Sequence, residues 1–399
     1  MKKSKIVLCT AKYSDNLGDG IISDCSKKLL LQSEPDATVV ELDISGRTEF
    51  SVQSEFDENW RSALKNKILS APNFIKYSIV VILWLLFTRS KLLKQTKLSL
   101  NKANLLVFGG GQLILDNFLS FPLKFYLISK TAHMMDIPIV VLGCGVGSKK
   151  SYLAEYLYKK SFSLKSFRAV YLRDINSKNS FIERFGDSFS GVVGLTSDSA
   201  LYSSETYNKI KADKAKSFEE LLVGVGISHP SELKAASSEE EGFSDKKIEK
   251  LWINTLNELN RSNYNLMLYT NGSAEDELFL SNISKKLNFI PQVAVRPISP
   301  LELVENISKF DVTLSHRLHS SIISSSLNIP SIGLSWDRKV MSFYEATNRS
   351  KFCLKGDDFY FNEIDLLIKE LTFGDCFFDI NNLKELMLSS TRNAIKDMK

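Results

Sequence analysis

The sequence contains few cysteines, which cross-link a chain, and few glycines and prolines, which are abundant in disordered or repetitive chains. Only five cysteines occur, and no two are spaced as a CxxC pair, so neither a disulfide framework nor a zinc site is indicated. Glycine and proline make up 19 + 9 = 28 of the 399 residues, too few for a collagen-like or low-complexity protein. We therefore expect a globular protein in a reducing compartment. The cysteines are Cys9, Cys25, Cys144, Cys353 and Cys376.

An excess of one charge is also lacking. Lys and Arg exceed Asp and Glu by 51 − 46 = 5. A nucleic-acid-binding domain usually has a pI above about 9 and a clustered basic face, and the sequence shows no such cluster. We expect no nucleic-acid partner, because this mild excess fits anionic small molecules or an anionic membrane surface better.

No apolar run is long enough to cross a membrane. The run at 6–9 is too short for a signal-peptide core of about 7 to 15 residues, so we expect the chain to stay in the cytoplasm. The apolar run Tyr77–Phe87, inside the apolar and basic segment 71–97, spans about 16 Å as a helix, half of a bilayer core. It has three interpretations: a buried helix or strand, a helix lying on the inner membrane face with basic anchors, or a subunit contact.

Short apolar runs alternate with helical periodicity along the chain, which is typical of parallel sheets covered by helices. The expected strands are 5–9, 37–42, 104–108, 138–142, 169–172, 221–226, 265–269, 293–296, 311–315 and 331–334. The expected helices are 21–31, 152–160, 175–185, 245–259, 275–287, 300–308 and 318–327.

A polar stretch divides this alternation into two halves. We expect a Rossmann-like N-terminal domain at 1–200, a linker at 201–220, a Rossmann-like domain at 221–375 and a C-terminal helix at 376–399. The predicted fold class is α/β, with two Rossmann-like domains whose parallel sheets face a central cleft.

Two glycine clusters follow expected strands. Gly109, Gly110 and Gly111 come after 104–108, and Gly145 lies in the GCGVG sequence after 138–142. Glycines at the carboxyl ends of parallel strands let backbone amides approach an anion, although a tight turn would also explain them. Because neither cluster fits GxGxxG or GxxxxGK[ST], a nicotinamide cofactor or a cleaved nucleoside triphosphate has little support.

The most informative turn follows the expected strand 311–315. Its residues are Ser315, His316, Arg317, Leu318 and His319. A guanidinium beside a helix N-terminus suits a carboxylate or phosphate, and an imidazole can transfer a proton near neutral pH. Alternatively, Arg317 makes an ordinary ion pair and His319 packs against its helix.

Three other turns carry polar candidates. Asn16, Gly18 and Asp19 follow the first strand, where Asp19 either caps the next helix or binds an acceptor hydroxyl. Arg173 follows another strand and makes either an ion pair or a ligand contact. His229, just past 221–226, could face the cleft.

Taken in order, these motifs resemble the polysaccharide pyruvyl transferase family over about residues 5 to 345. The pattern consists of an N-x-GD turn, a strand ending in GGG, a G-x-G turn, an RD pair, a D-x-A, and an RLHS block followed by IPSIGLSWDRK. The residues that carry it are Asn16, Gly18, Asp19, Gly109 to Gly111, Gly143 to Gly147, Arg173, Asp174, Asp198, Ala200, Arg317, Leu318, His319, Ser320 and Lys339.

The resemblance implies a GT-B-like fold and transfer of pyruvate from phosphoenolpyruvate to a sugar as a ketal, with release of phosphate and no cofactor or metal. It assigns Arg317 and His319 to the phosphoenolpyruvate site. Family members often carry an arginine after the strand that opens the second domain, where this chain has Ser228 and His229. His229 or Lys339 would have to replace that arginine.

The resulting hypothesis makes Arg317 and His319 catalytic. Arg317, Lys339 and the glycine-loop amides hold the donor, and His319 moves the proton. The acceptor is a sugar of a cell-surface polysaccharide, for which a lipid-linked oligosaccharide is one candidate. Two rival functions remain open: a GT-B glycosyltransferase using a nucleotide sugar, and a non-catalytic scaffold of polysaccharide assembly at the membrane.

Overall fold

The computed structural model describes residues 4–50, 73–116, 118–148, 150–209, 221–230, 244–373 and 379–396. The chain forms two compact units. The first comprises Met1–Ser14, Ile22–Ser199 and Glu385–Lys399, and the second comprises Asp15–Ile21 and Ala200–Lys384.

The first unit is built on a parallel six-stranded sheet with the order β2-β1-β3-β4-β5-β6. Its apolar runs form strands because helices cover both faces, so that every residue of β3 is buried. The strands are β1 (Lys5–Thr10), β2 (Thr38–Asp43), β3 (Leu105–Gly109), β4 (Ile139–Cys144), β5 (Phe167–Leu172) and β6 (Val192–Leu195).

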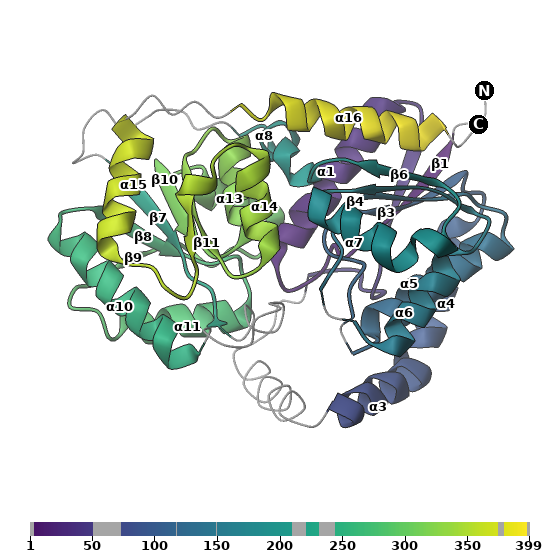
Figure 1. The fold of residues 1–399 in the computed structure, drawn as a ribbon, viewed down its shortest axis with the longest axis horizontal. Coiled ribbons are helices and arrows are strands. Elements are labelled where there is room, and N and C mark those ends of the chain that lie inside the picture. Colours follow the sequence, from purple (N-terminus) through teal and green to yellow (C-terminus); the bar gives the residue numbers. More distant parts are fainter. Residues whose placement is uncertain are drawn as a thin grey trace. The chain divides into compact units, whose positions relative to one another are not determined.

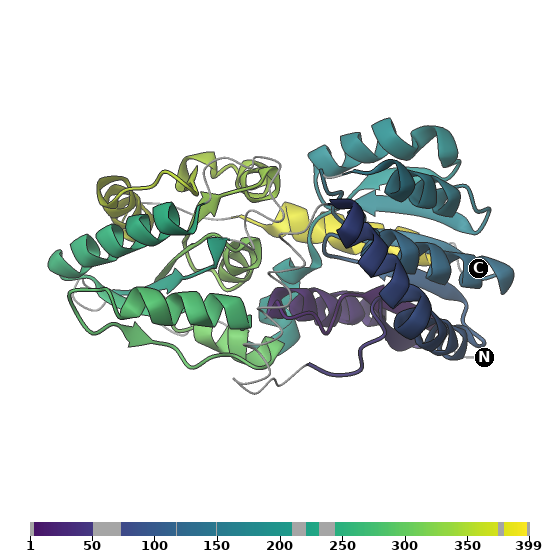
Figure 2. The same ribbon diagram turned by 90° about the horizontal axis from the view of Figure 1, so that it is seen from below.

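Figures 1 and 2 show helices on both faces of this sheet. A hydrophobic core rich in phenylalanine packs under one group of helices. In this core the rings of Phe108 and Phe125 are stacked, with their centroids 4.2 Å apart. The helices are α1 (Leu17–Ser33), α3 (Asn73–Leu83), the π-helix η1 (Trp84–Thr88), α4 (Arg89–Leu100), α5 (Ser120–Met134), α6 (Tyr152–Phe162), α7 (Ile175–Phe185), the 3-10 turn η2 (Gly186–Ser188) and α16 (Asn381–Lys396).

The second unit contains another parallel six-stranded sheet, with the order β12-β11-β10-β7-β8-β9. The strands are β7 (Leu222–Gly226), β8 (Asn265–Tyr269), β9 (Gln292–Val293), β10 (Val312–Ser315), β11 (Ser331–Ser335) and β12 (Cys353–Lys355). The helices are η3 (Ser199–Tyr202), α8 (Ser203–Tyr207), α10 (Asp245–Arg261), α11 (Ala274–Ser284), α12 (Pro300–Ile307), α13 (Leu318–Ser326), α14 (Arg338–Ala346), η4 (Ser350–Phe352), α15 (Phe361–Phe373) and α16, which begins in this unit.

The two parallel α/β sheets confirm the predicted fold class, whereas the cleft between the domains stays a prediction. Residues 15–21 group with the second unit and residues 385–399 with the first, neither of which was expected from the sequence. In the expected linker, residues 201–209 form the end of η3, the helix α8 and the two residues after it, and 210–220 lie outside the described residues. Of the expected C-terminal helix, residues 376–378 and 397–399 also lie outside the described residues.

The structure rules out one of the three interpretations of the apolar run Tyr77–Phe87. It forms the later part of α3 and most of η1, and within it Trp84 is buried whereas Leu86 and Phe87 are 68% and 69% exposed. A buried helix or strand is therefore wrong for this run. In the described part of the chain, no helix is long and apolar enough to cross a bilayer. Residues 71–72 of the segment 71–97 lie outside the described residues.

Candidate active site

The carboxyl ends of four neighbouring strands bring most of the predicted residues of the second unit together. Because β11, β10, β7 and β8 are adjacent and parallel, the turns that follow them open on one edge of the sheet. Arg317 follows β10, His229 follows β7, and Lys339 lies in the first turn of α14 after β11. Strand order, rather than distance along the sequence, assembles these residues.

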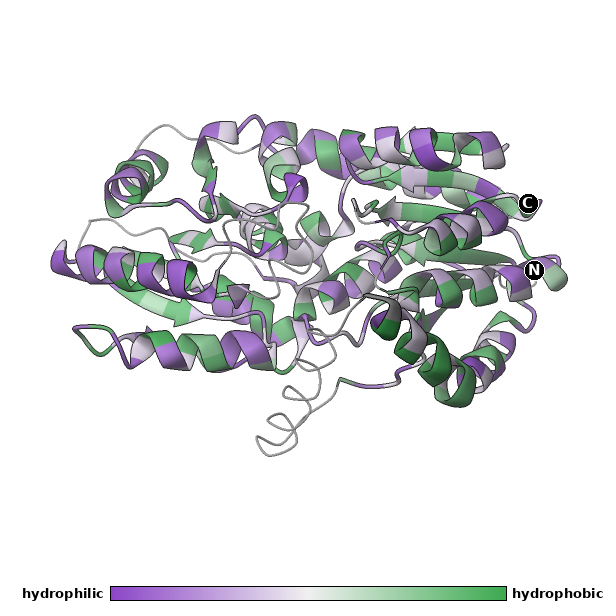
Figure 3. Cartoon of the chain, turned by 60° about the horizontal axis from the view of Figure 1, so that its bottom comes forward, coloured by the Kyte–Doolittle hydropathy of each residue, from purple (hydrophilic) through white to green (hydrophobic). Residues whose placement is uncertain are grey.

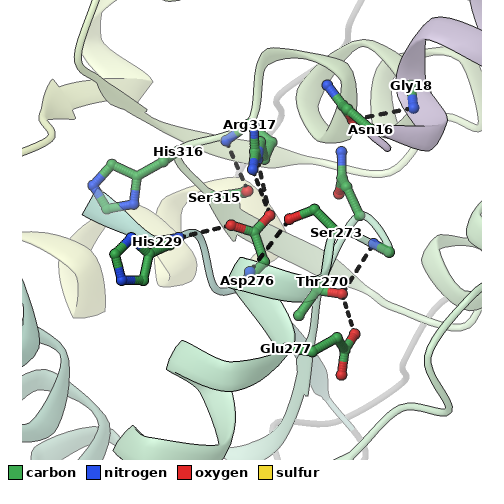
Figure 4. A network of polar contacts seen from close by, with 12 residues as sticks. Asn16, Gly18, His229, Thr270, Ser273, Asp276, Glu277, Ser315, His316 and Arg317 are labelled. Carbon is green, nitrogen blue, oxygen red and sulfur yellow. Dashed lines mark hydrogen bonds and ion pairs between the residues drawn. The ribbon is translucent and has the colours of Figure 1, made fainter. Parts of the chain in front are cut away.

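Arg317 occupies the N-cap position of α13, which begins at Leu318. Its backbone N–H donates to Oγ of Ser315 at 3.0 Å, which fixes the turn. Its guanidinium donates from Nε and Nη2 to Oδ2 of Asp276, at 3.2 and 2.5 Å (Figure 4). The ion pair that the sequence left as an alternative for Arg317 is therefore present.

Asp276 is the partner that the sequence did not reveal. Its side chain is fully buried in the first turn of α11, and its other oxygen, Oδ1, accepts the backbone N–H of His229 at 2.7 Å. One carboxylate thus ties the turn after β7 to the arginine after β10 (Figure 4). A guanidinium has five N–H donors, more than one carboxylate accepts, so Arg317 can pair with Asp276 and hold an anionic ligand at once.

His319 lies in the first turn of α13 and packs against the start of α1. A Cβ built on Gly18 would lie 2.3 Å from Nδ1 of His319, so only glycine permits this approach. The helix α1 begins at Leu17, earlier than the expected residue 21, because Asn16 caps it and accepts the Gly18 N–H at Oδ1. Asp19 therefore lies in the first turn of α1, and Asn16 holds the cap position expected for Asp19.

The loop after β8 supports this arrangement and was also missed from the sequence. The carbonyl of Asn271 accepts the Leu17 N–H at 3.3 Å, and Oδ1 of Asn271 accepts the Ser320 hydroxyl at 3.0 Å. Gly272, with φ of +94°, brings the loop against Leu17. Asn271 therefore joins the start of α1 to α13, the two elements that meet at His319. The sequence T-N-G-S at 270–273, directly after a strand, was the signal that could have identified this loop.

His316 is a structural histidine. It is fully buried, its Nε2 lies 2.7 Å from the Gly356 carbonyl, and its own carbonyl accepts the Trp336 indole N–H at 2.6 Å. Burial lowers the pKa of His316 to about 4, an effect reinforced by the charge of Arg317 and opposed by the Gly356 hydrogen bond. His316 is therefore neutral near pH 7.

The remaining candidates of the second unit lie around the same turn. Ser228 is fully buried, and within the described residues its Oγ has no hydrogen-bond partner. The His229 ring packs edge-on against Phe279 at 5.2 Å. Lys339 places Nζ 4.1 Å from the centre of the Trp336 ring, and Trp336 in turn binds the His316 carbonyl. Leu318 is buried as the first residue of α13.

The glycine clusters belong to the first unit. Gly110 and Gly111 have φ of +62° and +66°, and a Cβ on Gly110 would lie 1.9 Å from Cγ2 of Ile22. The Gly110 N–H donates to the Leu142 carbonyl, and the Gly145 N–H donates to the Gly111 carbonyl, each at 2.8 Å. Both amides are thus engaged within the fold, as the tight-turn alternative would have them, and Gly109 is the last residue of β3.

Arg173 also lies in the first unit, after β5. Its guanidinium is buried, with Nη1 at 3.3 Å from Asp198 and Nε at 3.5 Å from Asp174. Asp174 at the same time caps α7 through the Ser177 N–H. A Cβ on Gly145 would lie 2.9 Å from Nε of Arg173, so this glycine makes room for the guanidinium. The ion-pair alternative for Arg173 is therefore present in the structure.

Comparison with known sequences decides the family. Residues 16–338 match the sequence model of a family described as polysaccharide pyruvyl transferase, which is well over half of the chain. The chain belongs to this family. A search of curated protein sequences finds no significant match. The polysaccharide pyruvyl transferase match begins at Asn16, the cap of α1, and its last residue, Arg338, precedes Lys339.

Solved structures show that this pyruvyl transferase family member has a GT-B-like fold. The UDP-N-acetylglucosamine 2-epimerase from Rickettsia bellii is 11% identical, with a TM-score of 0.55 over 99% of this chain and 95% of the other. The UDP-GlcNAc 2-epimerase from Methanocaldococcus jannaschii is 9% identical, with a TM-score of 0.53 over 99% and 98%. A structure of S. aureus MnaA with UDP is 11% identical, with a TM-score of 0.50 over 98% and 91%. At these identities the likeness describes the fold.

Proposed function

We propose that this protein transfers pyruvate from phosphoenolpyruvate to two hydroxyls of a sugar, forming a ketal and releasing phosphate. Family membership supports the reaction class. The observation that carries the assignment to this chain is the meeting of Gly18 and His319 beside Arg317, because it joins the first and last family motifs in one unit. The acceptor belongs to a cell-surface polysaccharide or its lipid-linked precursor. A donor made inside the cell places the reaction in the cytoplasm.

In this proposal Arg317 binds the anionic groups of the donor. Phosphoenolpyruvate carries a carboxylate and a phosphate, and a planar guanidinium at the N-terminus of α13 suits either group. Asp276 holds the guanidinium in one orientation through Nε and Nη2. The Ser228 hydroxyl, buried after β7, offers a further hydrogen bond to the donor at the position where relatives often carry an arginine.

His319 supplies the proton. Its imidazole protonates the methylene carbon of the donor, which makes the adjacent carbon electrophilic. One sugar hydroxyl then adds to that carbon and loses its proton, and the second hydroxyl displaces phosphate and closes the ketal. An imidazole ordinarily titrates near pH 6.5, so one group can deliver the first proton and accept the next. We assign the acceptor hydroxyls to Asn16 and Asp19, which flank Leu17 and Gly18 at the start of α1.

Phosphate release tests this function directly. The purified protein is incubated with phosphoenolpyruvate and a panel of sugars, phosphate is measured, and the product is analysed by mass spectrometry. We expect phosphate release that depends on a sugar, and a product enlarged by one carboxyethylidene group. Thermal-shift measurements separate the main rival: stabilisation by phosphoenolpyruvate supports the proposal, and stabilisation by a nucleotide sugar alone would favour a glycosyltransferase.

A further inference from the structure

The helix formed by α3 and η1 presents large apolar side chains to solvent. Five consecutive or near-consecutive residues of this helix are 47–69% exposed, an arrangement that a globular protein rarely leaves without a partner. Figure 3 shows the helix that Figure 1 labels α3 among the most strongly hydrophobic surface elements. The five residues, named here the apolar ridge, are Ile82, Leu83, Leu85, Leu86 and Phe87.

The opposite face of the same helical run anchors the ridge. Trp84, Leu92 and Leu100 are buried in the core of the first unit. The Tyr77 hydroxyl donates to Oδ2 of the buried Asp116 at 3.0 Å. Because one face is fixed in the core, the ridge cannot turn inward, and its exposure follows from the fold of the unit.

The stretch of sequence that contains the ridge carries charge of one sign. Residues 73–115 contain six Lys and Arg and no Asp or Glu. The six are Lys76, Arg89, Lys91, Lys94, Lys97 and Lys102, and Lys91, Lys94 and Lys97 follow the ridge along α4 as exposed side chains. An apolar strip followed by exposed cations matches the face of a bilayer that contains anionic lipid, where acyl chains lie under negative headgroups.

Exposed aromatic side chains also occur near the start of α3. Tyr77 contacts Ser151, the N-cap of α6, so the start of α6 lies beside α3. In α6, Tyr152 and Tyr156 are 87% and 44% exposed. Tyrosine favours the boundary between water and hydrocarbon because its ring is apolar and its hydroxyl is polar.

A second copy of this chain fits the surface less well than lipid does. In a two-fold symmetric dimer through this patch, both protomers would bring the cations of α4 into one interface. No acidic residue between 73 and 115 is available to neutralise them. A bilayer with anionic headgroups supplies the missing negative charge.

We propose that the apolar ridge and the cations of α4 bind the surface of an anionic phospholipid bilayer. The ridge inserts to the level of the headgroups and upper acyl chains, and Arg89, Lys91, Lys94 and Lys97 pair with lipid phosphates. The helix lies along the interface, because the apolar run spans only about half of a bilayer core. This inference does not depend on pyruvyl transfer, although it would bring the protein to the surface where a lipid-linked acceptor of the proposed reaction would lie.

Vesicle cosedimentation tests the proposal with the full-length protein. Vesicles of phosphatidylcholine are compared with vesicles of equal parts phosphatidylcholine and phosphatidylglycerol. We expect binding to the second kind, weakened by added salt because the charges are screened. The variant L86S/F87S should bind at least about tenfold less. Replacing Arg89, Lys91, Lys94 and Lys97 by Gln should weaken binding by roughly fivefold for each charge removed.

The matched control is I290S/L366S, which alters two exposed apolar residues of the second unit. It should bind as the wild type does, and both double variants should release phosphate with a water-soluble acceptor at the wild-type rate. Failure of the wild type to bind the anionic vesicles, or equal binding by L86S/F87S, overturns the proposal. A wild-type dimer that L86S/F87S converts to a monomer, with no vesicle binding, would assign the ridge to a second copy instead.

Discussion

His319 lies so close to Gly18 that a methyl group on Gly18 would be 2.3 Å from the imidazole Nδ1. These residues are about three hundred positions apart in sequence, and both belong to the second unit. The proximity gives the N-terminal N-x-GD turn a physical role, because it forms the surface against which the proposed catalytic histidine rests.

Gly18→Ala should therefore displace His319. We expect kcat/KM for phosphoenolpyruvate to fall by about a hundredfold, because small misplacements of a reacting group cost that much. The control is Gly186→Ala, whose added Cβ would meet only Cγ2 of Ile182 at 3.6 Å and should leave activity unchanged. In a His319→Gln background, Gly18→Ala should add little further loss. A large additional loss would show that Gly18 acts through another residue.

Arg317→Ala should reduce both stability and turnover. It leaves the buried Asp276 carboxylate without its cation, which costs about 3–5 kcal/mol of unfolding free energy. The double variant R317A/D276N removes the uncompensated charge and should recover part of that stability, as measured by urea unfolding. It should not recover turnover, because the donor has lost its guanidinium.

Recovery of activity in R317A/D276N would contradict the role given to Arg317. The control ion pair is Arg261 with Glu258, whose side chains are 64% and 45% exposed. Arg261→Ala should cost less than about 1 kcal/mol and leave the rate of phosphate release unchanged.

His319→Gln should abolish proton delivery to the donor while the protein stays folded. With the wild type in deuterated water, we expect the new methyl group of the product to carry one deuterium, detected by mass spectrometry. His319→Gln should form product about a hundred to ten thousand times more slowly than the wild type, and the control His133→Gln should behave as the wild type does. Wild-type turnover by His319→Gln, with its thermal unfolding unchanged, would exclude His319 as the acid.

His316 should make stability depend on pH. Its pKa is lowered to about 4 in the folded protein, so the unfolded state binds more protons between about pH 4 and pH 6.5. The stability contributed by keeping His316 neutral is complete above about pH 6.5 and is lost as pH falls toward 4. From about pH 7 to about pH 5, this group should lower the unfolding free energy by about 2 kcal/mol.

His316→Asn should remove that part of the pH dependence, measured by urea unfolding at each pH. If the unfolding free energy of the wild type falls between about pH 7 and pH 5 no more steeply than that of the variant, His316 is not held neutral by burial. The phosphate-release rate of the variant at neutral pH, compared with that of His319→Gln, separates the structural histidine from the proposed acid.

The sequence predicted the sheets better than the site. Fully apolar runs such as Leu105–Gly109 indicate strands because both faces of the sheet are covered. The edge strand Val192–Leu195 was missed because it is short and only partly buried, and β12, α14 and α15 were missed as well. Strand 293–296 was placed slightly too late, since β9 covers only Gln292–Val293.

The contacts that build the site could not be inferred from local pattern. Asp276 and Arg317 are 41 residues apart and meet because β10, β7 and β8 are neighbours in the sheet. The apolar run Tyr77–Phe87 was ambiguous because nearly every residue in it is apolar, so periodicity could not show that Trp84 faces the core and Phe87 faces solvent. The RLHS turn was found because a strand, an arginine and a histidine occur together there.

A crystal structure of the protein grown with phosphoenolpyruvate tests the central claim most directly. The account predicts the carboxylate or phosphate of the donor within hydrogen-bond distance of the Arg317 guanidinium, and its methylene carbon next to the imidazole of His319. Donor density bound elsewhere on the chain, with Arg317 contacting only Asp276, would contradict it.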